Sequence, residues 1–209
     1  MKHRFFFTFV VCLGAAFGQE DDSKGTGSTA AAAPGSFQTQ TAKDRWNKYA
    51  KDAFLSPAPF FASVMPALGQ QNRNEPVEYG QGWDAFGNRV GRRAAQYQLQ
   101  TAIYHAGAAA MGTSTGYQRC ACSGGAKRLG YALSRSFVTK NSSGATVPNA
   151  AFLGGIVGGA VIASEAWYPA RYRWSGEGMQ TATVQVGVGT AFNIIQEFGP
   201  DLKKLFRRK

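Results

Sequence analysis

Acidic residues are scarce in this sequence, and histidine and cysteine are scarcer still. The chain of 209 residues has 12 Asp and Glu against 23 Lys and Arg, a formal net charge of +11, with two His and three Cys. Neither a His-x-x-x-His nor a Cys-x-x-Cys pair occurs, so a metal site of the usual kinds is not expected. We take none of the short motifs as catalytic, and we expect a non-enzymatic protein without a cofactor.

The sequence also lacks an apolar run long enough to cross a bilayer. The aliphatic segment from Ala150 to Ser164 contains the stretch FLGGIVGGAVIA and has 15 residues. As a helix it would cover about 22 Å of a hydrocarbon layer about 30 Å thick. Two interpretations stay open: a tightly packed soluble helix bundle, and a glycine-zipper hairpin that lies on or inserts in a membrane.

The N-terminus has the layout of a secretory signal peptide. Lys2 and Arg4 precede an apolar run over residues 5–17, and the small residues Ala16 and Gly18 lie at the −3 and −1 positions of a cleavage site. We expect cleavage after residue 18 and export to the periplasm or cell envelope. Cleavage removes two cations and no acid, which lowers the formal charge from +11 to +9.

Three parts of the chain are predicted: a signal peptide at 1–18, a flexible Ser/Thr/Gly/Ala leader at 19–41, and one helical domain at 42–209 with a basic C-terminal tail. The leader has almost no large apolar residue to offset the entropy of ordering. Outside the cytosol the positive charge suits anionic lipid or an envelope protein and not nucleic acid. A second copy of the chain is a further candidate partner.

Helical periodicity predicts an all-α class, a compact bundle of about six helices with glycine-rich contacts. Thr41 and Asp44 have capping-box spacing at the start of the first helix, where Arg45 and Lys48 are expected to face away from the apolar side. The longest helix is expected after Asp84 as its cap. Its apolar stripe runs through Phe86, Val90, Ala94, Tyr97, Thr101, Tyr104, Ala108 and Met111, and its polar flank carries Arg89, Arg92, Gln96 and Gln100.

A further amphipathic helix over residues 126–138 is expected to place three apolar residues on one side: Leu129, Leu133 and Phe137. The next residues, 139–149, are expected to be a connection.

The last helix is predicted to start after a Ser175 cap and to stop at Gly199 and Pro200. Alternation of Val184, Val186 and Val188 leaves a strand as the alternative. A small outer-membrane barrel would need many such alternating segments of about ten residues.

Glycines are expected to mediate close contacts between helices. Each costs about 1 kcal/mol of helix propensity, so several together imply a compensating contact. The expected partner of the segment at 150–164 is the last helix, or the small-residue flank of the long helix at Gly87, Gly91 and Ala95. The predicted contact residues are Gly154, Gly155, Gly158, Gly159 and Gly187.

Two features could carry chemistry or binding. Cys120 and Cys122 form a Cys-x-Cys pair that can close a disulfide in an oxidising compartment, and a periplasmic thiol or redox protein is the alternative function that follows from it. The stretch WYPARYRW suits the head-group level of a bilayer, although a loop packed on the bundle is the other interpretation. The candidate interface residues are Trp167, Tyr168, Arg171, Tyr172, Arg173 and Trp174.

Four stretches together resemble a group of uncharacterised exported bacterial proteins. They are EYGQGWDAFGNRVGRRAA, YQRCACSGGAKRLGYALSRSFVT, WYP and FNIIQEFGPDLKK. The resemblance covers about residues 55–205, implies a single exported domain, and brings no known activity. We therefore expect an exported envelope protein that associates with a membrane or an envelope partner through glycine-rich helices and a basic-aromatic surface.

Overall fold

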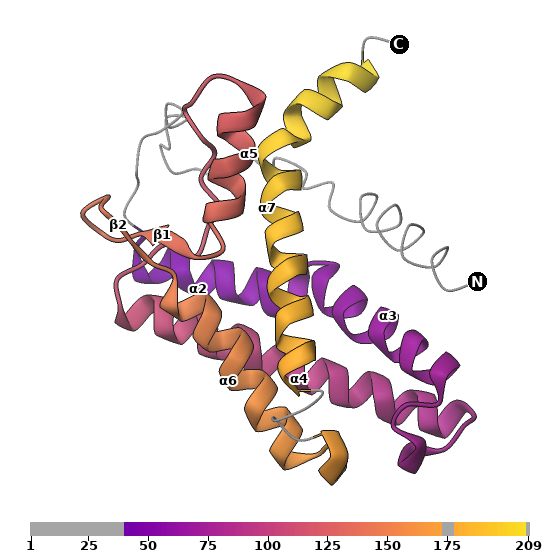
Figure 1. Ribbon diagram of the computed structural model, residues 1–209. Helices are drawn as coiled ribbons and strands as arrows, with labels where there is room; N and C mark the ends of the chain where they lie inside the picture. The colour runs from indigo at the N-terminus through magenta and orange to yellow at the C-terminus, as the bar shows by residue number, and fades with distance from the viewer. Residues whose placement is uncertain (1–39, 173–177, 208–209) are drawn as a thin grey trace. The chain divides into compact units, whose positions relative to one another are not determined.

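The computed structural model of the protein describes residues 40–172 and 178–207 (Figure 1). All of them belong to the second of two units into which the chain divides, Pro34–Lys209. The predictions for the signal peptide at 1–18, for the leader up to residue 39, for the Ser175 cap, and for Arg173 and Trp174 therefore lie outside the described residues.

The described residues are mostly helical, as the sequence predicts, with one small sheet in addition. The α-helices are α2 (Ala42–Ala50), α3 (Ala58–Arg73), α4 (Trp83–Ala110), α5 (Gly125–Ser134), α6 (Ala150–Ala166) and α7 (Met179–Arg207). The shorter elements are a π-helix (Lys51–Leu55), two 3₁₀ turns (Val77–Tyr79 and Ala170–Tyr172), and the strands β1 (Val138–Lys140) and β2 (Thr146–Pro148).

The helix starts show one prediction confirmed and one corrected. Thr41 caps α2 in a full capping box, in which its hydroxyl accepts from Asp44 N while the Asp44 carboxylate accepts from Thr41 N. At α4, however, the cap is Gly82 and Asp84 lies inside the first turn. Gly82 has φ 99°, a conformation that glycine adopts without steric cost. Asp84 instead contributes its negative charge at the positive end of the helix.

The segment after α5 folds into a hairpin where the sequence predicts a helix end and a connection. β1 and β2 pair antiparallel, with Thr139 opposite Val147. The Asn141 carboxamide oxygen accepts from the backbone N–H groups of Ser143 and Ala145. A side chain that satisfies turn amides in this way competes with helix formation, so residues 141–145 form the turn of the hairpin.

α7 is a helix and not a strand, but it does not stop where predicted. It continues through Gly199 and Pro200 to Arg207. A proline inside a helix leaves the carbonyl four residues earlier without its N–H donor. Here that carbonyl belongs to Gln196, and the Arg119 side chain donates to it at 3.1 Å. This tertiary hydrogen bond replaces the one that Pro200 cannot make.

α4 is the central helix of the described residues, because α3 and α6 both pack against it (Figure 1). α7 packs against α5 and α6. The apolar core between α6 and α7 is small, formed by Ile156, Ala160 and Ala182 with Phe152 and Val186 around them. No helix in the described ranges is both long and apolar enough to cross a membrane.

The buried face of α4 is more polar than predicted. Arg89, Gln96 and Gln100, which lie on the polar flank of the predicted apolar stripe, are buried. Arg89 donates to three backbone carbonyls in the 75–80 segment and to the Gln71 side chain. Gln100 donates to Ile156 O at 3.2 Å and to the Gln185 side chain at 2.6 Å. Buried polar groups are tolerated when they are hydrogen-bonded, and these residues tie α4 to its neighbours.

The apolar side of α5 is also turned the other way. Leu129 and Leu133 on α5, and Phe137 just after it, are exposed although the sequence places them on one apolar side. The side of α5 that faces α7 carries Arg128, which is ion-paired with the buried carboxylate of Glu197 at 2.7 Å. A buried carboxylate without a partner is very costly, so this pairing fixes the rotation of α5 and leaves the leucines outside.

Candidate functional site

Four large apolar side chains are exposed at the start of the described chain, and we call them the N-terminal apolar surface. They are Trp46 on α2, Phe54 and Leu55 on the π-helix, and Phe60 on α3. Their exposed fractions are 65%, 64%, 77% and 60%. The Tyr49 ring links the first two, with centroids 5.6 Å from Trp46 and 6.1 Å from Phe54. These aromatic contacts hold part of the surface together.

The apolar residues face outward because the polar side of the same segment is bound to α4. Arg45 donates to the carbonyls of Ala108 and Thr113, at 3.3 and 2.9 Å. The backbone carbonyls of Asp52 and Ala53 accept from Tyr97 and Gln98 on α4. The sequence predicts Arg45 on the side of α2 opposite the apolar residues, and from that side Arg45 donates its hydrogen bonds to α4 and the loop after it. Unpaired backbone carbonyls near a helix end need donors, and these polar contacts determine which side faces α4.

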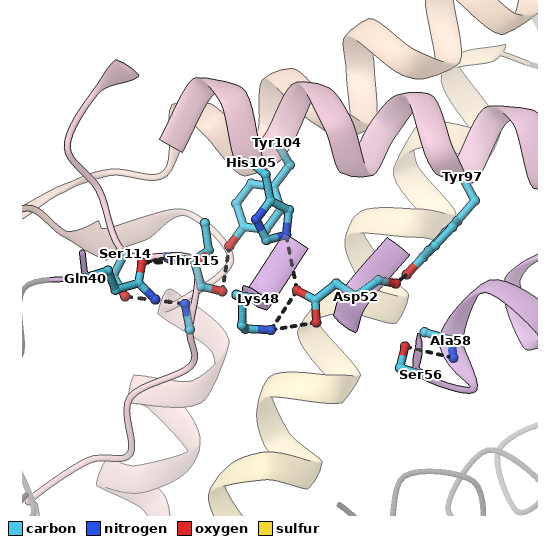
Figure 2. A network of polar contacts seen from close by, with 11 residues as sticks. Gln40, Lys48, Asp52, Ser56, Ala58, Tyr97, Tyr104, His105, Ser114 and Thr115 are labelled. Atoms are coloured by element: carbon cyan, nitrogen blue, oxygen red, sulfur yellow. Dashed lines mark hydrogen bonds and ion pairs between the residues drawn. The ribbon is translucent and has the colours of Figure 1, made fainter. Parts of the chain in front are cut away.

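A network of charged and polar side chains connects this segment to α4 (Figure 2). Asp52 on the π-helix pairs with Lys48 Nζ at 2.6 Å and with His105 Nε2 at 3.2 Å. Burial opposes ionisation of Asp52, but the hydrogen bond from His105 and the positive charge of Lys48 lower its pKa. Asp52 could not be identified from the sequence as the partner of His105, because the two residues are 53 positions apart. A histidine on the inner side of a long helix was the only signal for it.

The sequence GTSTG at 112–116 has the Gly-x-Ser-x-Gly spacing of a nucleophile elbow. An elbow places its serine on a sharp turn between a strand and a helix. Here Ser114 follows the end of α4, is buried, and hydrogen-bonds through its backbone to Lys140 and Thr139. His105 Nδ1 has no hydrogen-bond partner among the described residues. Ser114, His105 and Asp52 thus do not form a hydrogen-bonded catalytic chain.

Cys120 and Cys122 are joined in a disulfide, and their loop is held by one buried carboxylate on α7. Glu197 accepts from Cys120 N and from the Tyr117 hydroxyl, both at 3.0 Å, and from Arg128 Nε at 2.7 Å. Burial opposes its ionisation, but these hydrogen bonds lower the pKa of Glu197. The loop is therefore fixed by a hydrogen-bond network that does not require the sulfur atoms.

The glycines of α6 divide into two groups. A Cβ added at Gly155 would lie 2.9 Å from Gln100 O, and one at Gly159 would lie 3.1 Å from Gln100 Cα, so both glycines face the backbone of α4. A Cβ at Gly154 or at Gly187 would have no heavy atom of the described chain within 4 Å, and one at Gly158 would make only an ordinary contact of 3.8 Å with Ile103. The close approach thus involves neither Gly187 nor the small-residue flank of α4.

The predicted basic-aromatic interface packs largely on the protein itself. Tyr172 is buried and Tyr168 is half-buried. The Trp167 carbonyl accepts from the Tyr79 hydroxyl at 2.9 Å, and Arg171 pairs with Glu78 at 2.9 Å. This turn is thus bound to the 3₁₀ turn at 77–79, as expected for a loop packed on the bundle.

No known protein family, curated protein or solved structure matches the chain. The described ranges contain no group of three or more His, Cys, Asp or Glu side chains placed to hold a metal ion.

Proposed function

We propose that this is a non-enzymatic peripheral protein of the bacterial cell envelope, and that it binds anionic lipid surfaces through the N-terminal apolar surface. The observation that carries the proposal is the exposure of Trp46, Phe54, Leu55 and Phe60, each at least 60% exposed. Exposed apolar groups that lie together mark interaction sites, and Tyr49 joins Trp46 to Phe54 here. Aromatic and aliphatic side chains of this kind bury themselves at the boundary between head groups and acyl chains.

Charge supports a lipid target. Without residues 1–18 the chain carries a formal net charge of +9, and the cations Lys43 and Lys51 are exposed close in sequence to Trp46 and Phe54. A basic residue near an anionic membrane contributes about 1 kcal/mol of attraction. Apolar insertion and charge attraction would therefore act together.

The glycines of α6 serve the fold in this proposal. Gly155 and Gly159 bring α6 against the backbone of α4 within the chain, so we assign them to an internal contact and not to a membrane or partner. Association would then depend on the N-terminal apolar surface in place of the glycine-rich helices and the WYPARYRW turn.

The proposal includes export of the chain from the cytosol. The signal-like residues 1–18 would direct the chain out of the cytosol, and the Cys120–Cys122 disulfide is of the kind that persists in oxidising compartments. Mass spectrometry of the protein from an envelope fraction should place its N-terminus at or near Gln19. An intact Met1 on that material would contradict export by cleavage.

Vesicle co-sedimentation tests the lipid proposal directly. The protein should sediment with vesicles of phosphatidylglycerol and phosphatidylcholine, and much less with phosphatidylcholine alone. Replacing both Phe54 and Leu55 by Ser should weaken binding at least tenfold, because each buried side chain contributes about 1.5–3 kcal/mol. Trp83→Ser is the matched control, because Trp83 is 86% exposed but lies at the start of α4.

Two outcomes would contradict the proposal. Equal binding by the parent and the double variant would show that the N-terminal apolar surface is not the membrane contact. The second contradicting outcome would be seen by sedimentation velocity in the absence of lipid. If the parent self-associates without lipid and the double variant does not, the surface binds a second copy of the chain.

A further inference from the structure

A polar cavity of about 110 Å³ lies where the loop after α4, the end of α5, β1, and the start of α6 meet α7. A cavity needs roughly 10–15 Å³ to hold one water molecule, so this one has room for a small molecule. Its lining is dominated by side chains that form hydrogen bonds. Those that matter here are Ser114, Arg135, Thr139, Asn149 and Asn193.

Arg135 is the only cation in this lining, and it has no acidic partner among the described residues. It is 6% exposed. Its guanidinium lies over the Tyr131 ring, 5.6 Å from the centroid, but no described side chain or carbonyl accepts a hydrogen bond from it. Glu197, which reaches the neighbouring loop through Tyr117, is paired with Arg128 instead. A buried cation without a counter-charge is costly, and its five N–H donors are suited to an oxyanion.

The start of α6 is a second, independent feature of this cavity that favours a bound anion. Asn149 is the N-cap of this 17-residue helix, but its side chain makes no capping hydrogen bond. Its Nδ2 donates to Arg135 O at 3.2 Å, while its Oδ1 is buried without a partner. The first amides of a helix lack internal acceptors, and the helix dipole favours an anion there. Both Asn149 and Phe152 of this first turn line the cavity.

We propose that this cavity binds a small oxyanion that also carries a hydroxyl donor. The oxyanion would accept from the Arg135 guanidinium and lie near the start of α6. The hydroxyl would donate to Asn149 Oδ1, which accepts from nothing else described. Inorganic phosphate in its hydrogenphosphate form and a small hydroxycarboxylate both have this chemistry. The site is separate from the N-terminal apolar surface and does not depend on the proposed function.

Titration calorimetry on the folded chain tests the site with three probes: inorganic phosphate, glycolate and acetate. Phosphate or glycolate should bind saturably, and acetate, which has no hydroxyl, should bind more weakly than glycolate. Arg135→Gln should weaken binding by about tenfold to a hundredfold, the usual loss for a hydrogen bond to a charged group. Arg135→Lys keeps the positive charge but loses the forked arrangement of N–H donors. Its affinity should lie between those of the parent and of Arg135→Gln.

Lys140→Gln is the matched control, because it removes one positive charge from the neighbouring β1 while Lys140 does not line the cavity. Equal weakening by Arg135→Gln and Lys140→Gln would mean diffuse attraction and would overturn the proposal. So would the absence of saturable binding of both phosphate and glycolate to the parent, a result that needs no variant to fold. In the vesicle assay Arg135→Gln should bind as the parent does; a loss there with no binding of free phosphate or glycolate would instead assign the residue to lipid.

Discussion

Gly155→Ala tests the contact between α4 and α6 most directly. The added methyl carbon would lie 2.9 Å from both Gln100 O and Tyr104 Cβ, closer than such atoms approach without a shift. The first is a backbone atom of α4, so relief requires the helices to separate. Overpacking of this kind costs about 1–3 kcal/mol, while alanine recovers about 1 kcal/mol of helix propensity.

Gly154→Ala is the control that isolates the packing cost. A Cβ at Gly154 meets nothing described within 4 Å, so this variant should gain the propensity term of about 1 kcal/mol alone. The propensity term cancels between the two variants, and their difference is the packing cost of about 1–3 kcal/mol.

Urea denaturation followed by circular dichroism measures both variants against the parent. The midpoint should rise for Gly154→Ala, and the Gly155→Ala midpoint should lie clearly below it, with m-values unchanged. A difference of 1 kcal/mol corresponds to about 2–4 °C in Tm for a chain of this size. If both variants are stabilised equally, α4 and α6 do not approach closely at Gly155, and the reasoning fails.

Three further predictions concern the polar networks. Hydrogen bonds to Glu197 lower its pKa in the folded state. The ionised carboxylate therefore stabilises the folded state above the unfolded-state pKa of about 4.3, and this stabilisation is lost as the pH falls through the lower folded-state pKa. Glu197→Gln should therefore flatten the acid side of stability measured by urea denaturation at several pH values, and a curve parallel to the parent's would contradict this. Replacing Cys120 and Cys122 by Ser should leave the far-ultraviolet spectrum and location unchanged, because Glu197 holds the loop; loss of a thiol-dependent activity with the fold intact would instead favour the redox alternative. Asp52→Asn should lower the free energy of unfolding by about 1–3 kcal/mol, since it leaves His105 without its charged acceptor, and an unchanged urea midpoint would show that this pair contributes nothing.

Local signals were enough to predict the helices. The spacing of Thr41 and Asp44 predicts the capping box that starts α2, and residues in steps of three and four predict the long helix α4. The aliphatic, glycine-containing segment from Ala150 to Ser164 predicts α6, which runs over Ala150–Ala166. Each of these depends on hydrogen bonds and side chains a few positions apart, which the sequence displays directly.

The direction in which helices face could not be predicted in the same way. Periodicity assigns the apolar side of α5 to the interior, but the buried carboxylate of Glu197 requires Arg128 there. Likewise Arg89 is buried because it satisfies carbonyls of the 75–80 segment. These partners come from distant parts of the chain, and a long-range polar contact leaves no periodic pattern in the sequence.

The sequence by itself determined the helical class, the positive charge, the scarcity of metal ligands and the positions of most helices, because these follow from composition and short-range spacing. Only the tertiary structure decided that α7 continues through Pro200, where Arg119 supplies the missing donor. It also decided that Gly155 and not Gly154 faces α4, and that Arg135 and Asn149 share one cavity. Each of these depends on which distant groups meet, and that is settled when the helices pack.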